Sequence, residues 1–307
     1  MVCGGLQGSQ RRLVPGGHRD GEPRGGPYAA GMGELIPLFP LGTPLFPGVV
    51  LPLKIFEPRY RRLMQDLLAL PEAGDQRFFG VVAIRQGWEV EHVTPAEALY
   101  DIGCTARVQA VRAQPDGGFR IVTVGGERFR LLDVVVGEDP PYLQAEVEWL
   151  DEEEMAEDAA GDHDGIVDPP GLVVPGLTHP GLDDVVASVA RGSMGVLTRN
   201  VRDLFTRYVA EVADLSSGGG GDDEPVIDAE TAVLLHAVTG DPTALSYLVA
   251  SAALLTTEDR QALLAESATR RRLAAESRLL RRELTLLQEL GAVPVPLRDF
   301  ATPMTVN

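Results

Sequence analysis

The chain has 307 residues, of which 44% are hydrophobic and 23% charged, so it can bury a sizeable core in one or two domains. Its formal net charge is −18, and the resulting field disfavours sequence-independent nucleic-acid binding. Cys3 and Cys104 form no CxxC pair, so neither a disulfide framework nor a zinc motif is indicated. The apolar runs are too short to cross a bilayer, and the N-terminus lacks the apolar core of a signal peptide. We therefore predict a cytoplasmic protein.

Residues 1–31 are rich in Gly, Arg and Pro and show no hydrophobic periodicity, so we predict a disordered N-terminal extension. The ordered pattern begins directly after Met32, which we interpret as the natural start of translation. Detection of Gly4 by N-terminal sequencing of the natural protein would contradict that interpretation.

Residues 32–150 are predicted to form a β domain. Apolar and polar residues alternate from Leu143 to Trp149 and from Ile102 to Ala110, which is the period of a half-buried strand. Turn signals at 115–118 and at Gly125-Gly126 predict hairpins. Several short strands with one helix among them are most economically closed as a curled antiparallel sheet or a small barrel.

The prolines and glycines of the first strands have predicted architectural roles. Pro47-Gly48 is expected to turn the chain between two strands, and Pro52 to restrict its strand to an edge or a bulge. Lys54 is the only lysine among 27 basic residues. We expect Lys54 and Arg59 to be exposed or to pair locally with Glu57, and contact with a ligand is the alternative.

One helix is predicted within the β domain, over Pro58 to Leu70. Proline is favoured in the first helical turn, where its missing N–H costs nothing. The residues expected to face the core lie at helical spacing, namely Tyr60, Leu63, Met64, Leu67 and Leu68.

Residues 151–181 are predicted to be a solvated linker because acids, glycines and prolines replace the apolar periodicity. The first part contributes eight acids and no base: Asp151, Glu152, Glu153, Glu154, Glu157, Asp158, Asp162 and Asp164. His163 lies between two of these acids, but a mobile linker does not supply the fixed geometry of a metal site.

Residues 182–290 are predicted to form a helical bundle, with a flexible break at 216–224 and a tail over 291–307. Asp241-Pro242 supplies an N-cap and an N1 proline for one helix, and Thr257 opens the next.

The last helix, from about Ala268 to Leu290, is rich in arginine. Glu276, Glu283 and Glu289 are spaced so that they can pair with these arginines along the helix. We expect a solvated, ion-paired helix.

No catalytic motif is recognisable in the sequence. A P-loop requires a lysine in the motif GxxxxGK[ST], and the chain's one lysine, Lys54, does not lie in such a motif; HExxH and GxSxG motifs are also absent. The nearest approach is Gly192-Ser193-Met194-Gly195, which has no neighbouring His or Lys to activate Ser193. His92 and His236 are interpreted as structural. We predict no catalytic residue, no metal and no cofactor.

Nine blocks of the sequence resemble the N-terminal, substrate-binding domain of the Lon proteases. They are Ile36–Leu41, Leu45–Leu53, Ile55–Tyr60, Phe79–Val82, Asp101–Ala106, Val124–Arg130, Pro141–Val147, Ala244–Ala250 and Asp259–Leu264. Their order matches that of the family, and the likeness as a whole extends over most of 34–150 and 182–290. The resemblance implies an α+β fold, in which a PUA-like antiparallel β-barrel half is followed by a helical bundle.

The resemblance also implies a set of family-motif residues whose role is mainly structural. They are Phe46, Pro47, Gly48, Phe56, Glu57, Pro58, Arg59, Tyr60, Gly103, Arg128 and Phe129. Lon proteases continue with an ATPase module and a Ser-Lys protease domain, whereas this sequence ends at Asn307 and has no lysine other than Lys54 to supply them. We therefore expect a stand-alone, non-enzymatic module.

The leading hypothesis is a module that binds unfolded or exposed apolar segments of other proteins, as an adaptor in protein quality control, with a protease as a further partner. Neither nucleic acid nor membrane is an expected partner. One alternative is a cryptic hydrolase or accessory protease component that uses Ser193. Another is RNA binding, which PUA-like barrels also support and for which the Arg-rich final helix is the only local signal.

Overall fold

The computed structural model describes residues 34–71, 77–85, 97–152, 182–216, 238 and 240–291. Within 182–216, side chains are described for residues 192–215 only. The predicted N-terminal extension, most of the acidic linker, the glycine-rich break and the C-terminal tail lie outside these residues, as do His92, His163 and His236.

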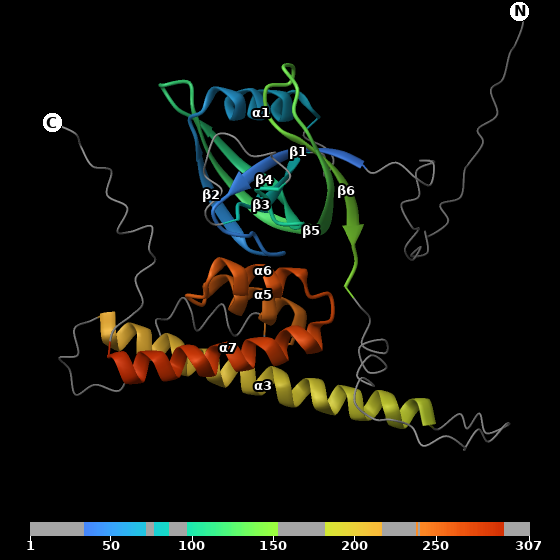
Figure 1. Cartoon of the computed structure of the whole chain (residues 1–307), viewed down its shortest axis with the longest axis vertical. Coiled ribbons are helices and arrows are strands. Elements are labelled where there is room, and N and C mark those ends of the chain that lie inside the picture. Colours follow the sequence, from blue (N-terminus) through green and yellow to red (C-terminus); the bar gives the residue numbers. More distant parts are fainter. Residues whose placement is uncertain are drawn as a thin grey trace, which may run out of the picture. The chain divides into compact units, whose positions relative to one another are not determined.

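Six strands form one curled sheet (Figure 1). They are β1 (Glu34–Leu41), β2 (Val50–Ile55), β3 (Phe78–Ala83), β4 (Ile102–Ala113), β5 (Phe119–Val135) and β6 (Gln144–Leu150). The strand order is β2-β5-β4-β3-β1-β6, and an additional pairing of β5 with β6 closes five of the strands into a ring. β1 and β3 are parallel, and the other neighbours are antiparallel. The predicted β-barrel half of an α+β fold is confirmed.

The turn predictions have mixed outcomes. The turn at 115–118 joins β4 to β5 as predicted, with Gly117 at φ +77°. Gly48 has φ +74° and turns the chain into β2, and Pro52 lies on a strand that pairs with β5 alone among the described strands. The predicted hairpin at Gly125-Gly126 is wrong, because β5 runs unbroken through both residues.

The physical reason is close backbone approach. A Cβ on Gly125 would lie 1.9 Å from the carbonyl oxygen of Phe46, so only glycine lets β5 cross the chain there. The same stretch is where β5 exchanges partners, pairing with β2 before Gly125 and with β6 from Arg128 onward.

Helix α1 (Pro58–Ala69) begins with Pro58 after the extended residue Glu57, as predicted. Tyr60, Leu63, Met64 and Leu67 are buried, whereas Leu68 is only half-buried. Each fully buried leucine side chain contributes about 1.5–3 kcal/mol through the hydrophobic effect, which is sufficient to hold this amphipathic helix against the sheet.

Four further helices are described: α3 (Leu182–Ser216), α5 (Pro242–Ala252), α6 (Thr257–Ala265) and α7 (Thr269–Leu290). Asp241 caps α5 by accepting hydrogen bonds from the amides of Thr243 and Ala244, which confirms the predicted N-cap. Helices α3 and α7 run side by side (Figure 1). None of the helices in the described ranges is both long enough and apolar enough to span a membrane.

One hydrophobic core joins the barrel to the helices. It combines barrel residues such as Phe46 and Phe79 with Tyr247 and Ala250 of α5 and Leu264 of α6. A second core lies among α3, α5 and α7, and a third lies between strands at Phe129. The helices α5 and α6 therefore pack directly on the β domain.

Candidate functional site

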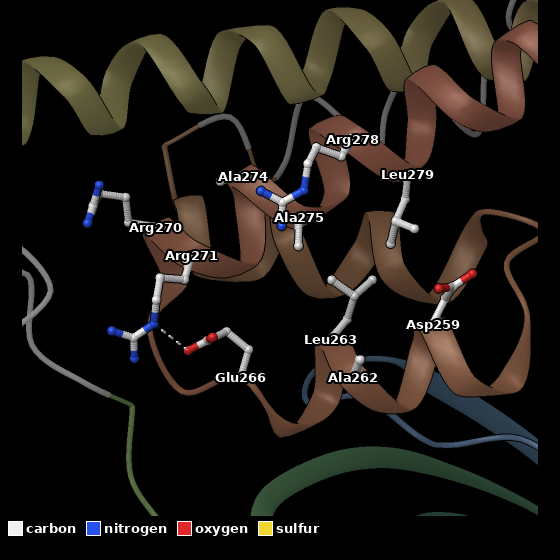
Figure 2. Close-up of a pocket in the computed structure, with 10 residues that line it drawn as sticks. All are labelled: Asp259, Ala262, Leu263, Glu266, Arg270, Arg271, Ala274, Ala275, Arg278 and Leu279. Atoms are coloured by element: carbon white, nitrogen blue, oxygen red, sulfur yellow. Dashed lines mark hydrogen bonds and ion pairs between the residues drawn. The ribbon is translucent and has the colours of Figure 1, made fainter. Parts of the chain in front are cut away.

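A groove between α6 and α7 is the candidate site (Figure 2). Its volume is about 580 Å³. The apolar side chains that line it are Ala262 and Leu263 of α6, with Ala274, Ala275 and Leu279 of α7. Leu279 and Ala275 also pack against the core that joins barrel and helices, so the floor of the groove is continuous with that core.

Arginines and acids surround this apolar floor. Arg271 donates from Nε to Glu266 Oε1 over 3.1 Å, a pair that Figure 2 shows at one end of the groove. At the other end Asp259 accepts a hydrogen bond from Arg282 Nη2 over 2.7 Å. Arg278 is exposed and forms no ion pair within the described part of the chain. The groove thus offers an apolar floor with an unneutralised cation at its rim.

Local sequence signals fix the two helices that form the groove. The Thr256 hydroxyl accepts from the amide of Asp259 over 3.1 Å and caps α6, and acids in its first turn favour the helix dipole. Glu266 accepts from the amide of Ala268 over 2.8 Å in the short connection to α7. Gly291, with φ +59°, ends α7 in the left-handed conformation.

Buried Arg128 attaches these helices to the barrel. From β5, its guanidinium donates to the carbonyl oxygens of Leu264 (2.9 Å) and Glu266 (3.2 Å) on the helical side. It also donates to the carbonyl of Asp151 over 3.0 Å and pairs with Glu152 over 3.1 Å. Arg128 is 2% exposed, so this family-motif residue holds the two halves together from inside the joint.

Glu152 connects Arg128 to a second buried arginine. Its carboxylate pairs with Arg272 Nη2 over 3.0 Å and accepts a hydrogen bond from the Tyr247 hydroxyl. The Arg272 guanidinium lies 4.1 Å from the centre of the Tyr247 ring, and burial raises the pKa of that tyrosine. The sequence placed Glu152 in a solvated linker; the structure instead places its carboxylate between Arg128 and Arg272, which supply the counter-charge.

The prediction of a solvated, ion-paired α7 is wrong for one face of the helix. Arg272 is fully buried, and Glu276 is 1% exposed, with neither of its carboxylate oxygens hydrogen-bonded to a residue that the structure describes. Burial raises the pKa of Glu276 well above its ordinary value. Glu283 is likewise buried, at 6% exposed, and it pairs over 2.7 Å with the adjacent Arg282, which is not the spacing of three or four residues that was expected. Ion-pair spacing along one helix does not reveal which face the neighbouring helices cover, which is why the burial was missed.

The remaining family-motif residues have structural surroundings. Phe46 is buried beside Tyr247, with ring centres 6.1 Å apart, and Tyr60 packs on Phe39 at 4.1 Å. A Cβ on Gly103 would lie 2.3 Å from the ring of Phe129, so this glycine makes room for that ring.

The residues that lead from β2 into the first turn of α1 are exposed or paired locally. Arg59 pairs with Glu57 over 2.9 Å as predicted, and Phe56 is 59% exposed. These residues shape the turn from β2 into α1 and lie apart from the lining of the α6–α7 groove.

The candidate nucleophiles find no catalytic surroundings. Ser193 is exposed on α3, and in the described ranges its hydroxyl has no hydrogen-bond partner. Cys104 is buried in β4, and burial raises the pKa of its thiol to about 12, so it stays protonated. No group of three or more metal-ligating side chains is found among the residues that the structure places.

Comparison with known proteins identifies the family. The family model of the ATP-dependent protease La (LON) substrate-binding domain matches residues 35–282, which include both the barrel and the groove helices. The chain belongs to this family. The resemblance noted in the sequence is therefore confirmed, and it concerns the N-terminal, substrate-binding part of Lon rather than its catalytic part.

Two curated relatives are Lon proteases of which this chain matches only a part. Lon protease 1 of Herpetosiphon aurantiacus is 27% identical over 254 residues, which are 83% of this chain and 24% of that protein. The Lon protease of Flavobacterium johnsoniae is 34% identical over 119 residues, 38% of this chain and 14% of that protein. The matched part of the chain therefore corresponds to 24% of the length of the first relative and to 14% of the length of the second.

Solved structures of Lon N-terminal domains align with the chain as well. A Lon N-terminal domain protein from Xanthomonas campestris shares 19% identity at a TM-score of 0.45, over 85% of this chain and 99% of that one. The N-terminal domain of Mycobacterium avium complex Lon protease shares 18% identity at a TM-score of 0.47, over 81% and 98%.

Proposed function

We propose that this chain binds exposed apolar segments of other polypeptides in the α6–α7 groove and catalyses no reaction itself. The observation that carries the proposal is the groove, with its floor of Ala262, Leu263, Ala275 and Leu279, in a chain of the LON substrate-binding family. When an apolar side chain enters such a concavity, most of its surface is removed from contact with water. This burial of apolar surface is the main source of affinity in small pockets.

The rim adds a preference to this apolar contact. Arg278 is exposed beside the floor and lacks an ion-pair partner among the described residues. A segment that places a carboxylate next to its apolar anchor gains a charge-assisted hydrogen bond there. We infer that the module serves as an adaptor that presents such segments to a protease in the cytoplasm, a role that the sequence suggested and that the experiment below begins to test.

The test is a binding titration with an unfolded protein. Fluorescein-labelled, reduced and carboxymethylated lactalbumin cannot refold and exposes apolar segments; native lactalbumin is the matched control. Fluorescence anisotropy should show binding of the unfolded form alone. Ala262 is exposed and lines the groove, so Ala262→Trp should fill it and weaken binding about tenfold, or about 1.4 kcal/mol.

Ala265 provides the control for this substitution. It is exposed at the end of the same helix and does not line the groove, so Ala265→Trp should bind as the parent does. Equal affinity of the parent and Ala262→Trp, with both proteins folded by circular dichroism, would overturn the proposal.

A further inference from the structure

The outer face of β2, β5 and β4 carries three cations in one row. The strand register places Lys54 opposite Arg120, and Arg120 opposite Arg112. All three side chains are exposed. Since neighbouring strands lie about 4.8 Å apart, the row concentrates three positive charges within about 10 Å.

These cations are not neutralised within the described part of the chain. Arg59 and Arg130 of the same domain pair with Glu57 and Glu148, whereas no ion pair is formed by any member of the row. Like charges directly opposite each other destabilise a sheet. An anion lying over the row would relieve that repulsion. The row is thus a local positive region in a chain whose formal net charge is −18.

Apolar side chains border the row on the same face. Pro52 lies opposite Val122, and Val50 opposite Val124 in the next row. Val50 is 59% exposed and Val122 is 39% exposed. The face therefore combines a line of positive charge with an adjoining apolar strip, which a partner buries only if it carries both kinds of group.

We propose that this β2–β5–β4 face binds an acidic protein segment in which carboxylate side chains stand beside apolar ones. The carboxylates lie over Lys54, Arg120 and Arg112, and the apolar side chains cover Val50 and Val122. The site is separate from the α6–α7 groove and does not depend on the function proposed for it.

A protein segment fits this face better than a nucleic acid does. A phosphate backbone would leave the strip formed by Val50, Pro52 and Val122 uncovered. The strongly negative chain as a whole also repels a polyanion. A short acidic segment meets only the local positive charge, because surface charges beyond about 8–10 Å are screened by physiological salt.

The experiment uses a fluorescein-labelled peptide of about twelve residues that alternates Glu and Val, so that its extended form separates charged and apolar faces. Comparison probes replace Glu by Lys, replace Val by Ser, or substitute labelled oligothymidylate for the peptide. The Glu-Val peptide should bind the full chain best, and its affinity should fall with added salt.

The central cation is the position to change. Arg120→Glu should weaken binding of the Glu-Val peptide by about tenfold or more, and the milder Arg120→Gln by less. Arg207→Glu, an equal charge reversal at an exposed arginine of α3 that belongs to neither the row nor the groove lining, should leave the affinity unchanged. The proposal is overturned if Arg120→Glu and Arg120→Gln both bind as the parent does, if the Lys-Val peptide or oligothymidylate binds more tightly, or if the Ser-containing peptide binds equally well.

Discussion

Replacing Arg128 by methionine should lower the free energy of unfolding and weaken the attachment of the helices to the barrel. Methionine retains an apolar stem of similar length but removes the guanidinium donors to the carbonyls of Leu264, Glu266 and Asp151. Each such bond is worth about 1 kcal/mol net, and somewhat more with a charged donor. The ion pair with Glu152 adds less, because that carboxylate side chain is 34% exposed. We expect a total loss of about 3–4 kcal/mol.

Arg130 on the same strand is the matched control. Its pair with Glu148 joins two side chains that are 52% and 54% exposed, so Arg130→Met should cost less than about 1 kcal/mol. Urea denaturation measures both, followed by tryptophan fluorescence and by the far-ultraviolet helix signal. Both tryptophans, Trp88 and Trp149, lie in the barrel half of the sequence.

The two signals report on different halves, which allows the coupling itself to be tested. In the parent they should change together, because one core and the Arg128 joint connect barrel and helices. In Arg128→Met the helix signal should be lost at lower urea than the tryptophan signal. Coincident transitions in the variant, or a cost no greater than that of Arg130→Met, would refute this account of the joint.

The other predictions concern the buried carboxyl, one glycine and the two surfaces. Burial raises the folded-state pKa of Glu276, so the folded form holds its proton more strongly and the parent loses stability as pH rises above the unfolded value of about 4.3. Glu276→Gln should therefore match the parent near pH 4 and exceed its Tm increasingly toward pH 8; a pH-independent difference would contradict this. Gly103→Ala should destabilise the barrel by about 1–3 kcal/mol through overpacking against Phe129, whereas Gly42→Ala, with no atom within 4 Å of the added Cβ, should not; equal midpoints in urea would count against the packing argument. Ala262→Trp should weaken binding of unfolded lactalbumin more than binding of the Glu-Val peptide, and Arg120→Glu should weaken binding of the peptide more than that of lactalbumin, as the anisotropy titrations will show.

Local structure could be predicted where a residue type or pattern is compatible with only one backbone conformation. Pro58 at a helix start, Asp241 at an N-cap and the alternation along β6 each follow from backbone geometry within a few residues. Gly125-Gly126 misled because glycine serves a turn and a close backbone crossing equally well, and only the position of Phe46 distinguishes them.

Tertiary partners decide the features that the sequence did not reveal. Arg272 and Glu152 are charged residues of the kind that is usually solvated, yet they form an ion pair in a largely buried cluster. The other members of that cluster, Tyr247 and Arg128, come from elements far away in the sequence, so no local pattern reveals it. The basic row on β2, β5 and β4 likewise required the strand register, since Lys54, Arg112 and Arg120 share no local motif. The groove could be found only from the distance between α6 and α7, which no pattern along either helix specifies.

Hydrogen–deuterium exchange of the full chain, with and without unfolded lactalbumin, tests the central claim most directly. Binding in the groove should slow exchange in peptides from α6 (Thr257–Ala265) and from the half of α7 that contains Ala274 and Arg278, and the slowing should vanish in Ala262→Trp. Unchanged exchange in both helices at saturating lactalbumin, or protection confined to another surface, would contradict the assignment of the groove as the binding site.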